Sequence, residues 1–193
     1  MSKLYFRYGA MSCGKSTLLM QVAYNYEKNN MKVVVIKSII DTKGDDKLVS
    51  RIGLNRKVDI LLGQDESVEK RLSKYKDIAC ILVDEAQFLE PKQVEELWKI
   101  SKKQDIPVIC YGLKGNFQSN LFVGSKRLIE LADEIEELVT ICSCGKRAKF
   151  NARYVNGKFA KEGEGILIDG SDSKVEYRPL CGKCYLSESE KNI

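Results

Sequence analysis

The feature that most constrains this chain is a glycine-rich segment near its N-terminus. Gly9–Ser16 reads GAMSCGKS, which matches the pattern G-x-x-x-x-G-K-[ST] in full. The run Leu4–Tyr8 predicts a buried strand before it, and the apolar spacing after it predicts a helix that ends near Asn29-Asn30. A phosphate-binding loop requires this order of strand, loop and helix, so a chance glycine-rich turn is the weaker interpretation.

Each residue type in this phosphate loop has a chemical reason. The glycines let backbone N–H groups close around a phosphate, and the helix that follows adds a dipole that favours the anion. Lys15 is expected to reach the β- and γ-phosphates of ATP, and Ser16 is expected to offer its hydroxyl to Mg²⁺. The predicted ATP-binding segment consists of Gly9, Ala10, Met11, Ser12, Cys13, Gly14, Lys15 and Ser16.

The next hundred or so residues alternate between strand and helix patterns. Strands are expected at Met31–Lys37, Ile78–Val83 and Pro107–Leu113, and helices over Ser67–Lys76, from Pro91 onward and after a cap at Ser125. The polar stretch Ser38–Asn55 is expected to be a long loop. This alternation predicts an α/β fold like that of the P-loop NTPases, with a mostly parallel sheet and helices on both faces.

One predicted strand ends in two carboxylates, Asp84 and Glu85. In open α/β sheets the carboxyl ends of the strands face the ligand crevice, and we expect this strand to neighbour the one before the phosphate loop. Asp84 would then orient Mg²⁺, directly or through water, and Glu85 would act on a nucleophile. The alternative is a solvated strand end, where acidic residues are common.

Composition removes several classes of function. The chain has no histidine, which excludes Ser-His-Asp triads, HExxH metalloproteases and Cys2His2 zinc sites. The net charge of +5 is mild and its charges are interspersed, so nucleic acid is not an expected partner. No apolar run is long enough to span a membrane and no secretory leader is visible, so we expect a cytoplasmic protein without a membrane partner.

After about residue 140 the alternation of strand and helix patterns stops and paired cysteines appear. This change predicts two domains, 1–140 and 141–193. Cys142-x-Cys144 and Cys181-x-x-Cys184 could supply four thiolates to a structural Zn²⁺ ion. A small lobe without a large core needs such a staple. The first pair is closer together than zinc ligands usually are, and four reduced structural cysteines are the alternative.

Aromatic residues follow the ends of several predicted strands. Phe88, Phe117 and Phe122 lie soon after such ends, and Tyr177 lies shortly before the second cysteine pair. A planar base could stack on these rings, although aromatic residues in such places are as often part of the core.

Together these motifs resemble the thymidine kinase family of the human cytosolic and bacterial type, most closely its enterobacterial branch. The resemblance covers nearly the whole chain and rests on LYFRYGAMSCGKST, ILVDEAQFL, ICYGLKGNF and the CxC…CxxCY ending. It implies an enzyme of deoxynucleotide salvage for DNA synthesis, which transfers the γ-phosphoryl group of ATP to the 5′-hydroxyl of thymidine. It also implies Mg²⁺, structural Zn²⁺ and a homotetramer.

The resemblance also assigns roles to residues. Glu85 is the base that accepts the 5′-hydroxyl proton; Asp84, Ala86 and Gln87 join the ATP site; and Asp41 contacts magnesium or phosphate. A zinc-tethered lasso loop at about residues 162–180 clamps the base through backbone groups. The implied thymidine-binding residues are Met11, Phe88, Leu113, Phe117, Phe122, Arg153, Gly165, Ile166, Leu167, Ile168, Asp169 and Tyr177.

This chain departs from the family pattern in a few places. The family's D-x-R-Y reads Asp41-Thr42-Lys43-Gly44, and the usual Gly-Gly of the lasso reads Asp169-Gly170. These departures leave the phosphate loop and the Asp84–Glu85 pair intact.

A rival interpretation belongs to another class. A P-loop ATPase would use Glu85 to activate water, and its zinc lobe would bind nucleic acid. The chain is short for a mechanochemical ATPase, and its C-terminal part is not a basic stripe. A purely structural nucleotide-binding module would leave Glu85 unexplained.

Overall fold

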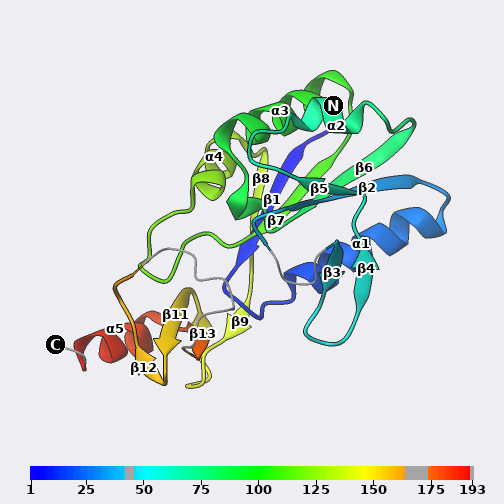
Figure 1. The fold of residues 1–193 in the computed structure, drawn as a ribbon. Helices are drawn as coiled ribbons and strands as arrows, with labels where there is room; N and C mark the ends of the chain where they lie inside the picture. Colours follow the sequence, from blue (N-terminus) through cyan, green and yellow to red (C-terminus); the bar gives the residue numbers. More distant parts are fainter. Residues whose placement is uncertain (42–45, 164–173, 192–193) are drawn as a thin grey trace.

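A six-stranded parallel sheet forms the centre of the computed structural model, which describes residues 1–41, 46–163 and 174–191. The strand order is β5-β2-β6-β7-β1-β8, and neighbouring strands pair in parallel (Figure 1). The predicted parallel sheet is therefore confirmed. The strands are β1 (Leu4–Gly9), β2 (Lys32–Ser38), β5 (Ile60–Leu62), β6 (Ile78–Asp84), β7 (Val108–Gly112) and β8 (Glu134–Leu138).

Helices cover both faces of this sheet because successive side chains of a strand point to opposite sides. Val33 and Val35 of β2 pack against the face of α1 (Lys15–Lys28). Their neighbours Val34 and Ile36 pack on the other face. That face is covered by α2 (Val68–Leu72), α3 (Pro91–Lys103) and α4 (Val123–Leu131).

The expectation that Ser38–Asn55 is one long loop was wrong. The segment contains β3 (Lys47–Val49), which pairs with β4 (Asn55–Lys57) to form an antiparallel hairpin. The hairpin forms because Leu48 is only 1% exposed and belongs to the apolar cluster on the α1 side of the sheet. A single buried leucine in a polar segment does not produce the alternation of apolar and polar residues by which a strand is recognised in a sequence.

Two helix expectations also need correction. The helix expected over Ser67–Lys76 is shortened to α2, because only Val68 and Leu72 of it are buried. Ser125 does not cap a helix; it lies inside α4, where its hydroxyl donates a hydrogen bond to the carbonyl of Leu113 at 2.5 Å. The first turn of α4 is therefore tied to Leu113, directly after β7.

The strand that carries Asp84 is not a neighbour of the strand before the phosphate loop, contrary to expectation. β7 lies between β6 and β1 and pairs with both. All three strands run parallel, so their carboxyl ends still meet at one edge of the sheet.

The C-terminal part of the chain is built differently. β9 (Thr140–Ile141) pairs with β10 (Arg147–Ala148), and β11 (Phe150–Val155) lies between β12 (Lys158–Phe159) and β13 (Val175–Leu180), all antiparallel. A final helix, α5 (Gly182–Glu190), packs beside them, although no helical periodicity was recognised there (Figure 1). None of the helices in the described ranges is long and apolar enough to cross a membrane.

Candidate active site

The carboxyl ends of β1, β6 and β7 open into a cavity of about 810 Å³. Its walls come from the phosphate loop, the short helix η1 (Ala86–Phe88), the loop after β7, the β3–β4 hairpin and the strands β11 and β13. The cavity brings together many predicted site residues. These are Met11, Ser12, Gly14, Lys15, Ser16, Asp41, Asp84, Glu85, Gln87, Phe88, Leu113, Phe117, Phe122 and Tyr177.

Other predicted site residues do not line the cavity. Gly9, Ala10 and Cys13 belong to the body of the phosphate loop, and Ala86 is fully buried in η1. The lasso positions Gly165, Ile166, Leu167, Ile168 and Asp169 lie outside the described residues.

The glycines and the lysine of the phosphate loop fix its backbone conformation. Gly14 has a φ of +84°, and a Cβ atom on Gly9 would lie 2.5 Å from the Cys13 sulfur. The Lys15 side chain is only 8% exposed, and its Nζ donates a hydrogen bond to the Ala10 carbonyl at 3.3 Å. The ammonium group therefore sits over the loop at the start of α1, where a phosphate would bind.

Asp84 and Ser16 meet next to the loop. The Ser16 hydroxyl donates a hydrogen bond to Asp84 Oδ2 at 3.2 Å. Asp84 is 4% exposed, and its Oδ1 has no hydrogen-bond partner in the described part of the chain. Burial raises the pKa of Asp84 to about 7, and the charge of Glu85 adds to that shift. A buried carboxylate oxygen without a donor, beside a hydroxyl, is the kind of ligand set that fits Mg²⁺.

Glu85 follows Asp84 in a constrained backbone conformation. Its φ of 48° lies in the left-handed region, which costs a non-glycine residue about 1–3 kcal/mol. The Gln87 side-chain amide donates to Glu85 Oε2, and Gln87 Oε1 accepts the N–H of Leu113 at 3.0 Å. Gln87 is 2% exposed, so a buried amide ties the Glu85 carboxylate to the end of β7.

A buried lysine that sequence reasoning missed supports Asp41. Lys37 Nζ lies 3.0 Å from Asp41 Oδ2, and the lysine side chain is only 1% exposed. Lys37 is also in register with Asp84 on the neighbouring strand β6. The only signal in the sequence was a charged residue at the end of an apolar run, which is also how an ordinary strand end looks.

The predicted base-binding aromatics lie on one side of the cavity. Phe88 and Phe122 pack edge to face, with ring centroids 5.7 Å apart. Phe117 is 1% exposed, and the guanidinium of Arg153 lies 3.6 Å from the centre of its ring. Arg153 is itself 2% exposed and does not line the cavity. Its guanidinium stacks on Phe117, which lines the cavity, and its contact with the nucleoside stays a prediction.

Asn151 is a second cavity residue that sequence reasoning missed. Its Oδ1 accepts the N–H of Met11 at 2.8 Å, and its Nδ2 donates to the Gly115 carbonyl at 3.2 Å. The side chain, on β11, therefore joins the C-terminal lobe to the phosphate loop and to the loop after β7. The partners are distant in sequence, so no local pattern could have revealed this role.

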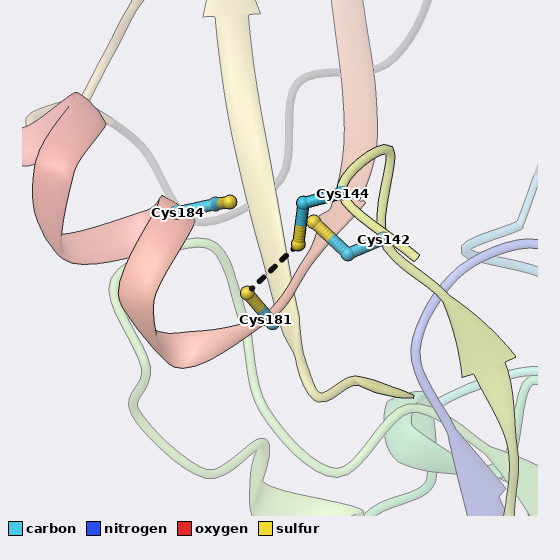
Figure 2. A group of neighbouring side chains, drawn as sticks. All are labelled: Cys142, Cys144, Cys181 and Cys184. Carbon is cyan, nitrogen blue, oxygen red and sulfur yellow. Dashed lines mark hydrogen bonds between the residues drawn. The ribbon is translucent and has the colours of Figure 1, made fainter. Parts of the chain in front are cut away.

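The side chains of the four paired cysteines point toward one another (Figure 2). Their sulfur atoms all lie within 4.8 Å of one another, and those of Cys144 and Cys181 are 3.5 Å apart. Zn–S bonds of about 2.3 Å place tetrahedral sulfurs roughly 3.8 Å apart, so this geometry fits a four-thiolate metal site. The tight first pair is accommodated by a turn in which Gly145 has a φ of +82° and its N–H donates to the Cys142 carbonyl.

Comparison with known proteins gives matches along nearly the full length. The thymidine kinase family model matches residues 2–185. A thymidine kinase of Haemophilus influenzae is 44% identical over 195 residues, covering 95% of this chain and 100% of the relative. A thymidine kinase of Chromobacterium violaceum is 42% identical over 187 residues, covering 96% of this chain and 98% of the relative.

A third relative has the same name and a similar extent. The thymidine kinase of Francisella tularensis is 43% identical over 190 residues, which are 95% of this chain and 96% of the relative. A solved Pif1 helicase of Candida albicans reaches a TM-score of only 0.43, at 15% identity over 71% of this chain and 36% of that chain, which is too loose to bear on function. The full-length matches in sequence show that this chain belongs to the thymidine kinase family.

Proposed function

We propose that this protein transfers the γ-phosphoryl group of ATP to the 5′-hydroxyl of thymidine. One observation carries the proposal: the phosphate loop and Glu85 line the same cavity as Phe88 and Phe122. A nucleoside stacked on these rings could present its 5′-oxygen to a phosphate held on the loop. An in-line approach of this kind is what phosphoryl transfer requires.

The phosphate side of the reaction uses residues of β1, α1 and β6. The loop N–H groups and Lys15 would hold the β- and γ-phosphates, with Ser16 and Asp84 as the residues that would hold Mg²⁺, and Asp41 close by. The ion, when bound, neutralises charge on the phosphate oxygens. Lys15 stabilises the charge that spreads over the transferring group.

Glu85 would take the proton of the acceptor. The bond between the 5′-oxygen and the γ-phosphorus forms while the bond from that phosphorus to the bridging oxygen breaks, and ADP leaves. A carboxylate with an ordinary pKa of about 4.3 cannot ionise an alcohol beforehand, so the proton moves late in the transfer. Gln87 fixes the position of the carboxylate for this step.

The C-terminal lobe would complete the nucleoside side. A Zn²⁺ ion would be held by Cys142, Cys144, Cys181 and Cys184. It would fix the end of β13 and the start of α5, and so the position of Tyr177 of β13 on the cavity wall. Met11, Leu113 and Phe117 would surround the thymine ring. A closed site of this kind excludes water and so disfavours simple ATP hydrolysis.

Nucleoside dependence of ATP turnover tests this proposal against the rival ATPase. ADP release should be slow with ATP alone and should rise strongly when thymidine is added, because the acceptor oxygen must lie in line with the γ-phosphate. Thymidine that lacks its 5′-hydroxyl should bind without being phosphorylated. Brisk ADP release that responds to single-stranded DNA or RNA and ignores thymidine would favour the rival.

The assembly is an expectation from the family resemblance, and the compartment is an expectation from the sequence. We propose a homotetramer that works in the cytoplasm. Light scattering on the purified protein, with its zinc bound, should give about four times the mass of one 21.9 kDa chain. A mass of one or two chains at micromolar concentration would contradict the tetramer.

A further inference from the structure

The β3–β4 hairpin forms a wall of the cavity that no predicted role explains. Residues Lys47, Leu48 and Val49 of β3 line the cavity, as do Ser50, Arg51 and Ile52 of the turn that follows. The turn is closed by its own hydrogen bonds: the N–H of Ser50 donates to the Leu54 carbonyl at 2.8 Å, and the N–H of Leu54 donates to the Ser50 hydroxyl at 3.0 Å. The tip therefore has a defined shape.

This hairpin is anchored to the helix that starts at the phosphate loop. Leu48 is buried in the same apolar cluster as Leu19 of α1. Arg56 of β4 pairs with Glu27 of α1 at 2.7 Å, and the Lys37 ammonium donates to the Lys47 carbonyl at 3.4 Å. These contacts fix where the tip stands relative to Lys15 and Ser16.

Arg51 stands at the tip and reaches the phosphate loop. It lines the cavity together with Ser12, Lys15 and Ser16, and its Nη1 donates a hydrogen bond to the Ser12 hydroxyl at 2.5 Å. The guanidinium is thus placed directly beside the loop that would hold the phosphates, although it comes from a distant part of the chain.

Among the described residues Arg51 makes no ion pair, unlike Arg56 and Lys57 of the same hairpin. Arg56 pairs with Glu27, and Lys57 pairs with Asp46. In the described ranges, no carboxylate lies within 4.0 Å of a nitrogen of Arg51. Its contact is a neutral hydroxyl. A phosphate would bring a negative charge to the guanidinium and could accept two parallel hydrogen bonds from it.

We propose that Arg51 binds the γ-phosphate of ATP and stabilises the negative charge of the transferring phosphoryl group. The proposal rests on the proposed kinase function and adds a cation to it from outside the phosphate loop. The planar guanidinium can donate two parallel hydrogen bonds to phosphate oxygens, which an ammonium cannot. In GTPases an arginine at the transferring phosphoryl is worth about 10³–10⁵ in rate. A smaller effect is expected here because the Arg51 side chain is exposed, so water screens its charge.

The test compares R51Q and R51K with the matched control K57Q. Lys57 is on the same hairpin, is 77% exposed in its side chain and lies outside the cavity, so K57Q removes the same charge without removing a ligand contact. With thymidine and ATP, kcat of R51Q should fall about 10–100-fold, R51K should lie between R51Q and wild type, and K57Q should stay within twofold of wild type. Thermal unfolding should not change in R51Q, because the side chain is exposed.

A binding measurement separates this proposal from the choice of acceptor. Calorimetry with ADP and with the non-hydrolysable analogue AMPPNP needs no thymidine. R51Q should bind AMPPNP about tenfold more weakly than wild type and should bind ADP almost equally well, since only AMPPNP carries a γ-phosphate. Equal binding of both nucleotides by R51Q and wild type, or equal loss of kcat in R51Q and K57Q, would overturn the role of Arg51. If thymidine leaves the ATP turnover of the wild type unchanged while R51Q still binds AMPPNP more weakly than wild type, that combination would overturn only the proposed acceptor.

Discussion

Replacement of Glu85 by glutamine should lower kcat by about 10²-fold or more and should leave ATP binding nearly unchanged, because a general base contributes about 10²–10⁴ in rate. The variant E85Q keeps the size of the side chain and an oxygen that can accept the Gln87 hydrogen bond. It loses only the affinity of a carboxylate for a proton. Steady-state rates with saturating thymidine, together with ATP titrations, measure both effects.

The control for this prediction is E69Q. Glu69 is an exposed acid in α2 that does not line the cavity, so kcat of E69Q should match wild type. An E85Q enzyme with near-normal turnover would remove Glu85 from the role of base. A similar loss in E85Q and E69Q would point to a general effect of charge.

Loss of one zinc-binding thiolate should have the second large effect, and it should weaken the use of thymidine more than the use of ATP. Cys144 is exposed and Cys184 is half-buried, so C144S and C184S remove a ligand without opening a hole in the core. The purified wild type should contain about one zinc per chain, and these variants much less, because a closed structural site needs all four thiolates. KM for thymidine should rise about tenfold or more, and KM for ATP much less, since the metal lies in the lobe that carries Tyr177.

The variant C110A is the control for the replacement of zinc-binding cysteines. Cys110 is fully buried in β7, away from the four-cysteine cluster. C110A should lose some stability, about 1 kcal/mol, and should keep its zinc and its KM for thymidine. A wild-type protein that is free of metal and fully active, or a C144S variant with unchanged zinc content, would contradict the proposed zinc site.

The parallel sheet could be predicted from the sequence because its signals are local. The strand before the phosphate loop and the one before Asp84 are apolar runs bounded by turn residues, and burial on both faces makes such runs continuous. The glycines, lysine and serine of the phosphate loop lie at fixed positions within eight consecutive residues, so the motif can be recognised without a structure. The β3–β4 hairpin was missed because a single buried leucine, Leu48, anchors it from a polar segment.

Much of the site depends on contacts between distant residues, which leave no local pattern. Asn151 contacts Met11 from 140 positions away, and Arg51 contacts Ser12 from 39 positions away. Both are ordinary polar residues in their own surroundings. Arg153, which the resemblance places at the nucleoside, stacks on Phe117 from a different part of the chain.

The most direct test of the central claim is the fate of the γ-phosphoryl group. ATP labelled with ³²P in the γ-position is incubated with the protein, Mg²⁺ and thymidine, and the products are separated by chromatography. The label is expected on the 5′-oxygen of thymidine as thymidine monophosphate, in equal amount to the ADP formed, and it should stay in ATP when thymidine is left out. Label that appears as inorganic phosphate at the same rate with and without thymidine would contradict the account.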